Sequence, residues 1–291
     1  MSVSPQFPTV WHPFSYLQGP MPELPEVETT RLGIAPAILG HRITAVVVRE
    51  PRLRWRIAAD LPEAAARQTV RNVRRRAKYL LIDLDHGSLI LHLGMSGNLR
   101  VMDAKTAPIT HDHVDIVLET GQCLRFNDPR RFGSLHYTAA DPGEHPLLKR
   151  LAPEPLEDGF DVDYLTTTAR GRKVTIKQFI MNSHVVVGVG NIYASESLFR
   201  AGIRPRRAAG RITREEMAKL AAAIKAVLQD AIKAGGTTLR DYVNPEGVSG
   251  YFRQQLFVYE RAGEPCRRCR TLIRQLRQGG RSTYFCPGCQ R

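Results

Sequence analysis

Two pairs of cysteines near the end of the chain constrain its folding more than any other feature. Cys266 and Cys269 form one Cys-x-x-Cys pair, Cys286 and Cys289 form a second, and 16 residues separate the two. Each pair can hold a metal ion from a tight turn, and two such pairs complete a tetrahedral thiolate site. Disulfides or a redox pair are the alternatives. The spacing favours zinc, so we predict one structural Zn2+ ion.

The segment around these cysteines is too polar to fold around an apolar core. Residues 261–291 contain eight arginines, no lysine and a single acid, Glu264. Metal binding would therefore supply the folding free energy of this segment. Between the two pairs, Thr271–Ile273 and Ser282–Phe285 are predicted to form the strands of a short β-hairpin, with Arg281 near its tip. The fifth cysteine, Cys123, lies in an alternating stretch and is predicted to be a small core residue.

The whole chain is strongly basic. Lysine and arginine total 42 against 28 acidic residues, which gives a formal net charge of +14. Such an excess attracts polyanions, of which nucleic acid is the commonest, although acidic proteins and membrane surfaces also attract basic proteins. A second basic cluster is free of acids, and a solvated surface is the alternative for it; its members are Arg67, Arg71, Arg74, Arg75, Arg76 and Lys78. No apolar run approaches the roughly 18 residues that span a bilayer, so we expect no membrane segment.

Residues 41–138 show the pattern of short antiparallel strands. Each predicted strand is rich in Val, Ile and Leu and is bounded by turn residues. The predicted strands are Ile43–Val48, Tyr79–Leu84, Ser88–Leu93, Val114–Leu118, Cys123–Phe126 and Ser134–Tyr137. A helix precedes them, from about Pro25 to Leu39, and Gly40 is its predicted stop. Strands of this length and spacing predict a β-sandwich.

The pattern then changes to helices. Residues 139–160 are rich in proline and are predicted to be a linker, whereas residues 161–236 favour helices. The clearest helix begins with the capping box Thr213-x-x-Glu216 and ends at Gly235 and Gly236. Its apolar stripe is predicted to pack in a core, and consists of Met217, Leu220, Ile224, Val227, Leu228 and Ile232. Glycines and a proline predict a mobile loop over Thr237–Tyr251.

The first 20 residues carry no charged side chain and contain four prolines. A secretory signal needs a basic start and a continuous apolar stretch, and a mitochondrial presequence would be rich in arginine. We therefore interpret residues 1–21 as a disordered leader or as the product of a mis-assigned start codon. In either case we expect the active protein to begin at Pro22, directly after Met21.

Several motifs between Met21 and the chain end resemble those of the formamidopyrimidine-DNA glycosylases, bacterial enzymes that remove 8-oxoguanine and ring-opened purines from DNA. The motifs are MPELPEVE at 21–28, RRAKY at 75–79, HLGMSG at 92–97, DPRRFG at 128–133, VGVGNIY at 187–193 and the two cysteine pairs. The resemblance implies an α+β multidomain fold. Its parts would be a β-sandwich catalytic domain with a flanking helix at 22–138, a linker at 139–160, a helix–two-turn–helix domain with a lesion-recognition loop at 161–255, and a zinc finger with a β-hairpin at 256–291.

The resemblance also implies a bifunctional glycosylase and abasic-site lyase of base excision repair, with Pro22 as the nucleophile. A terminal amine has a pKa near 7.7 to 8, against about 10.4 for lysine, so much more of it is free base at neutral pH. Because proline is a secondary amine, its adduct with the sugar is a charged iminium, which promotes β,δ-elimination. If residues 1–20 remain attached, however, the nitrogen of Pro22 is a tertiary amide and cannot attack.

Further catalytic roles come from the same resemblance. Glu23 would be the general acid at the sugar, and Glu26, one helical turn later, would help to orient the site. Lys78 and Arg281 would complete the catalytic set by contacting phosphates around the lesion. Without the resemblance, Pro22 would suit a helix start, and the two glutamates would suit the positive end of a helix dipole.

An enzyme that acts on a base inside duplex DNA must extrude it and fill the gap. The resemblance assigns Met95, Arg130 and Phe132 to this plug, where Met and Phe replace lost stacking and Arg bonds to the orphaned cytosine. It places His92, His111 and Asn191 among the DNA-binding residues. Asn191 also has the residue type of a helix N-cap, so helix amides there could hold a phosphate. Core packing is the alternative for Met95, Phe132 and His92, a turn for Arg130, and a solvated charge for Lys78.

The expected partner is double-stranded DNA that contains an oxidised purine or an abasic site, bound by a monomer in the bacterial cytoplasm, associated with the nucleoid. Two other functions remain open at this point. One is an endonuclease VIII-like glycosylase for oxidised pyrimidines, which shares the fold and the proline chemistry. The other is a zinc protein that binds DNA without catalysis.

Overall fold

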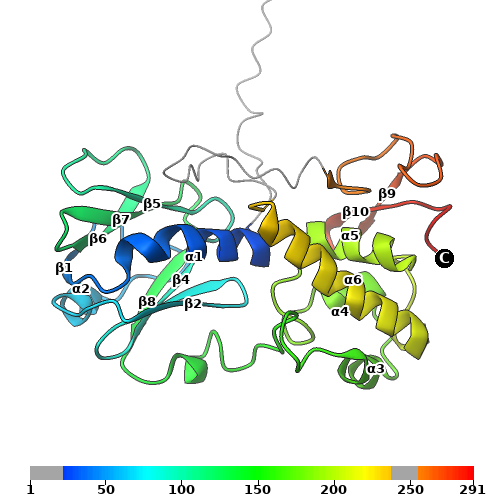
Figure 1. Cartoon of the computed structure of the whole chain (residues 1–291), viewed down its shortest axis with the longest axis horizontal. Helices are drawn as coiled ribbons and strands as arrows, with labels where there is room; N and C mark the ends of the chain where they lie inside the picture. The colour runs from blue at the N-terminus through cyan, green and yellow to red at the C-terminus, as the bar shows by residue number, and fades with distance from the viewer. Residues whose placement is uncertain (1–21, 237–254) are drawn as a thin grey trace, which may run out of the picture.

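The computed structural model describes residues 22–236 and 255–291. These residues form two lobes, one built from β-sheet and one from helices, with a small β-hairpin above the helices (Figure 1). The first 20 residues and the predicted loop over Thr237–Tyr251 lie outside the described residues. None of the described helices combines the length and the apolar character that a membrane crossing needs.

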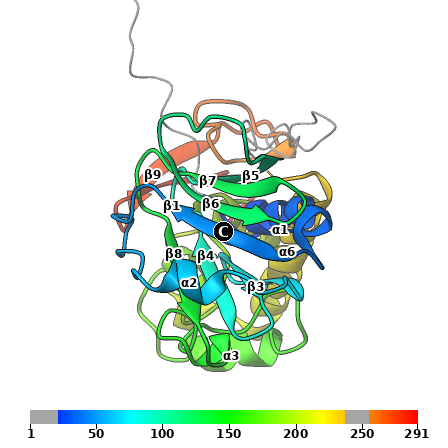
Figure 2. The same ribbon diagram turned by 90° about the vertical axis from the view of Figure 1, so that its left-hand side faces the viewer.

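The β lobe is the predicted sandwich of two antiparallel sheets, which Figure 2 shows stacked one above the other. The first sheet has the order β1 (Ile43–Val48), β6 (Asp112–Leu118), β7 (Gln122–Asn127), β5 (Asn98–Asp103). The second has the order β2 (Asn72–Arg76), β3 (Tyr79–Asp83), β4 (Ser88–His92), β8 (Ser134–Thr138). Each of the strands predicted between residues 41 and 138 is present within two residues of its expected ends. Strands β2 and β5 have no counterpart in the prediction.

The core between the sheets is apolar, and a short helix, α2 (Leu61–Ala65), closes one end of it. Fully buried side chains such as Leu80, Leu91 and Phe126 fill the space. Cys123 is buried as predicted. Helix α1 (Leu24–Ile38) covers the sandwich with Val27, Ile34 and Ile38, and its first turn reaches the helical lobe (Figure 1). The start of α1 is thus placed at the junction between the lobes.

The helical lobe contains α3 (Val162–Ala169), α4 (Ile176–Ile180), α5 (Asn191–Ala201) and α6 (Arg214–Lys233), with short 3-10 turns at Pro142–Glu144 and Ala209–Arg211. Helix α6 begins with the predicted capping box, since Thr213 and Glu216 exchange side-chain and backbone hydrogen bonds. Its predicted apolar stripe is buried except for Ile232, which is partly buried against the same core. Leu24 of α1 joins this second core, so α1 contributes to both lobes.

The hairpin consists of β9 (Arg274–Gln278) and β10 (Arg281–Phe285), joined by a Gly-Gly turn. The prediction for its first strand was wrong, because Thr271–Ile273 belongs to the turn after the first cysteine pair rather than to the ladder. There Leu272 forms an isolated bridge to Pro265. The second strand and the place of Arg281 at the tip are confirmed, since Arg281 pairs with Gln278 beside the turn.

Candidate active site and metal centre

The start of α1 is held against the start of α5. The Glu23 carboxylate accepts hydrogen bonds from the backbone amides of Gly190 at 2.7 Å, Ile192 at 3.1 Å and Tyr193 at 3.4 Å. These amides point out of a helix N-terminus, which is a ready site for negative charge. A Cβ on Gly190 would overlap the carboxyl group of Glu23, so the approach requires glycine there.

This contact also corrects one expectation. Gly190, rather than Asn191, is the N-cap of α5, and it provides no side-chain cap. The Glu23 carboxylate takes the amides that a capping side chain would bind. The Asn191 side chain turns elsewhere and accepts a hydrogen bond from Nζ of Lys177 at 2.6 Å.

Glu26 holds the residues directly after Pro22 in place through two hydrogen bonds of its carboxylate. Its Oε2 accepts a hydrogen bond from the amide of Glu23 at 2.9 Å, and its Oε1 accepts one from the hydroxyl of Tyr193 at 2.6 Å. Both glutamates are buried. The peptide that carries Pro22 is therefore fixed on its C-terminal side by hydrogen bonds that cross from one lobe to the other.

Opposing effects act on the acidity of Glu23, and the net effect is a raised pKa. Burial raises the pKa of the Glu23 carboxyl, and the charge of Glu26 adds to the rise, while Lys78 and the amides of α5 oppose it. A carboxyl group with a raised pKa keeps its proton closer to neutral pH and can act as a general acid. The geometry thus gives Glu23 a property that a proton donor needs.

Lys78 lies on the turn between β2 and β3 and faces the same charges. Burial lowers the pKa of Lys78, and Arg281 lowers it further, whereas Glu23 and Glu26 raise it. The turn is fixed by Glu154, whose Oε1 accepts a hydrogen bond from the amide of Ala77 at 2.5 Å. Lys78 thus connects the glutamate pair electrostatically with the tip of the zinc hairpin.

His92 stands at the end of β4 as a neutral ring. Burial, together with the charges of Lys78 and Arg54, lowers the pKa of His92 to about 4. Its Nδ1 accepts a hydrogen bond from the amide of Gly94 at 2.9 Å, so the neutral ring carries its proton on Nε2. His92 can therefore donate one hydrogen bond to an acceptor such as a phosphate oxygen.

A cleft of about 760 Å³ opens beside His92. Of the residues predicted to bind DNA or act in catalysis, those in its lining are His92, Met95, Arg130, Phe132 and Arg281. The Phe132 ring remains 43% exposed, and the Arg130 guanidinium lies 5.0 Å from its centroid. An exposed Phe and a Met beside an arginine in one cleft are suited to entering a base stack.

The cleft also contains residues that the sequence did not single out. These residues are Arg52, Leu53, Arg54 and Arg131. The run RLRWR at 52–56 contains three arginines and no acid. This local excess of positive charge could have identified Arg52 and Arg54 as candidate DNA-binding residues. Arg54 contributes to the lowered pKa of His92, so it affects the chemistry of the site as well as its shape.

Other predicted residues lie outside the cleft lining. Among the described residues, Pro22, Glu23, Lys78 and Asn191 gather at the junction of α1 and α5 rather than in the cleft. His111 stands apart, exposed on the loop before β6 with a positive φ of 72°. Its carbonyl accepts a hydrogen bond from the amide of Asp128 at 3.1 Å, which connects it to the Arg130 loop.

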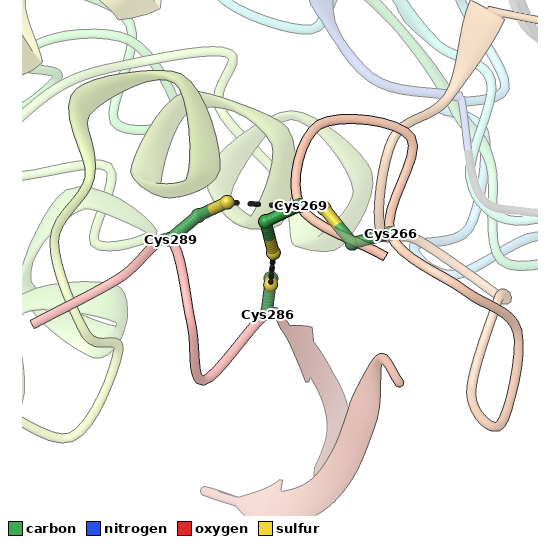
Figure 3. A group of neighbouring side chains, drawn as sticks. All are labelled: Cys266, Cys269, Cys286 and Cys289. Atoms are coloured by element: carbon green, nitrogen blue, oxygen red, sulfur yellow. Dashed lines mark hydrogen bonds between the residues drawn. The ribbon is translucent and has the colours of Figure 1, made fainter. Parts of the chain in front are cut away.

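The four cysteines of the two pairs converge on one point (Figure 3). Their sulfur atoms all lie within 4.8 Å of one another. The sulfurs of Cys266 and Cys289 are 3.8 Å apart, and those of Cys269 and Cys286 are 3.4 Å apart. A tetrahedron with Zn–S bonds of about 2.3 Å has edges of about 3.8 Å. The cluster therefore fits one structural zinc ion.

Two buried polar residues attach this zinc unit to the helical lobe. Nζ of Lys177 donates hydrogen bonds to Thr283 Oγ1 at 2.8 Å and to the carbonyl of Ser282 at 3.0 Å. The Glu196 carboxylate accepts hydrogen bonds from the amides of residues 257–259, each at 2.9 Å. These contacts fix the hairpin so that Arg281, at its tip, reaches the cleft.

Comparisons with known proteins cover nearly the whole chain. Family models match residues 21–135 as the formamidopyrimidine-DNA glycosylase N-terminal domain, 151–243 as the H2TH domain of the same enzymes, and 263–291 as a zinc finger found in FPG and IleRS. The formamidopyrimidine-DNA glycosylase of Thioalkalivibrio sulfidiphilus is 58% identical over 271 residues, 93% of this chain and 100% of that protein. That of Alkalilimnicola ehrlichii is 57% identical over 277 residues, with the same coverage.

Solved structures agree with these sequence matches. The MutM (FPG) protein from Thermus thermophilus has a TM-score of 0.82 and 38% identity, covering 92% of this chain and 98% of that chain. A Lactococcus lactis FPG mutant in complex with a Fapy-dG containing DNA has a TM-score of 0.86 and 32% identity, covering 93% and 100%. The L. lactis protein is also known in complex with DNA that contains an abasic site, with a TM-score of 0.86.

Proposed function

The chain belongs to the formamidopyrimidine-DNA glycosylase family, and from this premise we propose that it excises oxidised purines from DNA through the amine of Pro22. It is a zinc-containing DNA glycosylase of base excision repair. The observation that carries the mechanism is the locked glutamate pair directly after Pro22, in which Glu23 is buried against the N-terminus of α5.

The proposed reaction begins with the free amine of Pro22. Its nitrogen attacks C1′ of the damaged nucleotide, the bond from C1′ to the base breaks, and the base leaves with a proton. Glu23, whose pKa is raised by burial, supplies a proton at the sugar as the ring opens. The resulting iminium acidifies the hydrogens on C2′, so a C2′ proton is lost as the 3′ phosphate leaves, and a C4′ proton is then lost as the 5′ phosphate leaves.

The cleft supplies the binding side of the proposal. Met95, Arg130 and Phe132 would enter the gap that the extruded base leaves, and Phe132 is already exposed for this. His92 would donate a hydrogen bond to a phosphate, and Arg281 and Lys78 would add positive charge around it. His111 and Asn191 remain proposed DNA contacts, although Asn191 first serves as an acceptor for Lys177.

The mechanism sets a requirement on the chain terminus. A nitrogen in a peptide bond has no available lone pair, so the nitrogen of Pro22 can react only when no residue precedes it in the chain. We propose that the active form begins at Pro22, produced by translation from Met21 and removal of that methionine. Because the substrate is DNA, we propose that this form acts in the bacterial cytoplasm, in association with the nucleoid.

Borohydride trapping tests the proposal directly, because it converts a Schiff base between protein and DNA into a stable bond. The two proteins to compare are the form that begins at Pro22 and the form that retains residues 1–21. On a duplex with 8-oxoguanine opposite cytosine, we expect a trapped adduct with the first form and none with the second. Mass spectrometry of the adduct should assign the bond to Pro22.

Other outcomes would overturn parts of this account. An equal adduct from the form that retains residues 1–21, still intact by mass spectrometry, would exclude Pro22 as the nucleophile. No adduct from either form would exclude the Schiff-base mechanism, and no release of 8-oxoguanine in addition would indicate a DNA-binding protein without catalysis. Faster cleavage of a thymine glycol duplex than of the 8-oxoguanine duplex would identify an endonuclease VIII-like specificity instead.

A further inference from the structure

The two loops that carry the proposed plug both cross from one sheet of the sandwich to the other. One contains Met95 and joins β4 to β5, and the other contains Arg130 and Phe132 and joins β7 to β8. Strands β4 and β8 belong to one sheet, while β5 and β7 belong to the other. The two crossings therefore lie side by side at one end of the sandwich.

Asp128 shares its carboxylate between these two loops. Its Oδ1 accepts a hydrogen bond from Ser96 Oγ at 2.6 Å, and its Oδ2 accepts one from the amide of Gly133 at 2.8 Å. Ser96 Oγ in turn accepts a hydrogen bond from the amide of Arg130 at 3.2 Å. A carboxylate that is 0% exposed thus bonds to the residue after Met95 and to the residue after Phe132.

The loops are also packed backbone against backbone. A Cβ on Gly94 would overlap the amide nitrogen of Gly133 and the carbonyl carbon of Phe132. A Cβ on Gly133 would lie 2.6 Å from the Phe126 ring and 2.7 Å from the carbonyl oxygen of His92. Glycines at both positions let the loops touch without an intervening side chain. The contact is therefore close enough for one loop to fix the other.

Asp128 is itself held from the first sheet. Its carbonyl oxygen lies 2.8 Å from Nε2 of the buried His113, and its amide donates to the carbonyl of His111 at 3.1 Å. The backbone of Asp128 is consequently anchored to β6 and the loop before it, while its carboxylate bonds to the two loops. Hydrogen bonds to a charged, buried group are stronger than those between neutral groups, so this arrangement resists rearrangement.

We infer that Asp128 and Ser96 are positioning residues that join the Met95 loop and the Arg130–Phe132 loop into one rigid plug. This inference rests on the proposed function, since it assumes that these side chains fill the gap. A plug that is rigid before DNA binding loses less conformational freedom on entering the base stack. The Asp128–Ser96 pair would therefore speed base extrusion and leave the chemistry at Pro22 unaffected.

The test uses Ser96→Ala in the form that begins at Pro22, with Ser96→Thr as the conservative variant that keeps the hydroxyl. Two single-turnover rates are measured, excision of 8-oxoguanine opposite cytosine and strand cleavage at a preformed abasic site. An abasic site has no base to unstack, so it depends less on the plug. We expect Ser96→Ala to slow excision by about tenfold and abasic-site cleavage by less than about twofold, with Ser96→Thr close to the unaltered enzyme in both.

A double-mutant cycle with Phe132→Ala shows whether Ser96 acts through the plug. We expect Ser96→Ala to slow excision less in the Phe132→Ala background than alone, since the plug it positions is already damaged. Equal slowing of both reactions, additive effects on excision, or no effect of Ser96→Ala would each overturn the inference. If Phe132→Ala itself leaves excision unchanged, the proposed role of the plug fails. If Phe132→Ala slows excision and Ser96→Ala does not, the positioning role of Ser96 fails and the proposed role of the plug stands.

Discussion

The β-sandwich and the zinc hairpin contribute to the same cleft, yet they differ in what holds each together. The sandwich encloses an apolar cluster that includes the fully buried Leu80, Leu91 and Phe126. The cluster beneath the hairpin is small, and two of its members, Cys266 and Cys286, are metal-binding cysteines. None of the residues of β9 is buried. Hydrophobic burial stabilises the first region, whereas the second needs its metal ion.

The attachment of the two regions to the rest of the molecule differs in the same way. Helix α1 covers the sandwich with apolar side chains. The hairpin instead is fixed by the buried polar side chains of Lys177 and Glu196, each of which forms several hydrogen bonds to it or to the segment before it. The position of Arg281 depends on this polar attachment, whereas the position of His92 depends on the apolar core. Loss of the metal ion and removal of a core side chain should therefore affect the two sides of the cleft differently.

Loss of zinc should have the largest effect. Structural zinc ions contribute about 10 to 16 kcal/mol of apparent binding free energy in isolated fingers. This far exceeds the free energy that burial of the small apolar cluster beneath this hairpin can contribute. We expect Cys286→Ser to release the metal and reduce cleavage of 8-oxoguanine DNA by at least about 100-fold, because Arg281 is no longer held in the cleft. Zinc content by elemental analysis and single-turnover cleavage measure the two effects.

The chain offers a matched control for this variant in Cys123, which is buried in the sandwich and lies outside the metal cluster. Cys123→Ala should retain one zinc ion per chain and most of the cleavage rate. Full cleavage by a metal-free Cys286→Ser protein would show that the hairpin does not need its ion. The contrast between the two regions would then lose its basis.

Removal of a core side chain should have the next largest effect, and it should fall on stability. Leu91 lies on β4 and is 1% exposed, so Leu91→Ala should lower the free energy of unfolding by about 2 to 5 kcal/mol. Leu272, in the zinc segment, is 57% exposed, so Leu272→Ala should change it by less than about 0.5 kcal/mol. Urea denaturation measures both values, and zinc content should stay unchanged. Similar losses from both variants would contradict the assigned division of stability.

The same difference explains how far the sequence predicts the fold. Strands with a regular apolar pattern, such as β1 and β4, were predicted with nearly their observed ends. Strand β2 was missed because it contains Arg74, Arg75 and Arg76, whose charges are compensated by acids distant in the sequence, such as Glu154. The first hairpin strand was misplaced because an exposed strand shows no alternation, while the apolar Leu272 and Ile273 belong to the metal-binding turn.

The site shows the same limit more sharply. Motifs indicated Pro22, Glu23 and the cysteines, and local spacing sufficed for the metal cluster. The contact between Glu23 and the amide of Gly190, by contrast, joins residues 167 positions apart. Spacing alone cannot predict such a contact, because it depends on how two lobes pack. The wrong assignment of Asn191 as an N-cap follows from this, since the capping group comes from the other lobe.

The smallest predicted effect concerns the salt dependence of DNA binding and compares the two sides of the cleft. Arg281 is a cation, so a contact to phosphate would release about one counterion. His92 is neutral at pH 7, because its pKa is lowered to about 4 by burial and by neighbouring charges. We therefore expect Arg281→Gln to reduce the slope of log K against log salt by about 0.9, and His92→Gln to leave the slope unchanged.

Fluorescence anisotropy with a duplex that contains a tetrahydrofuran abasic analogue measures these slopes, between pH 6 and 8. Because the pKa of His92 lies below this range, the ring gains a proton only as the pH falls toward 4, and its contribution should not vary between pH 6 and 8. An equal loss of slope in His92→Gln would mean that DNA raises the pKa of His92 enough to protonate it. The sandwich side of the cleft would then bind phosphate through charge, as the hairpin side does, rather than through a neutral hydrogen bond.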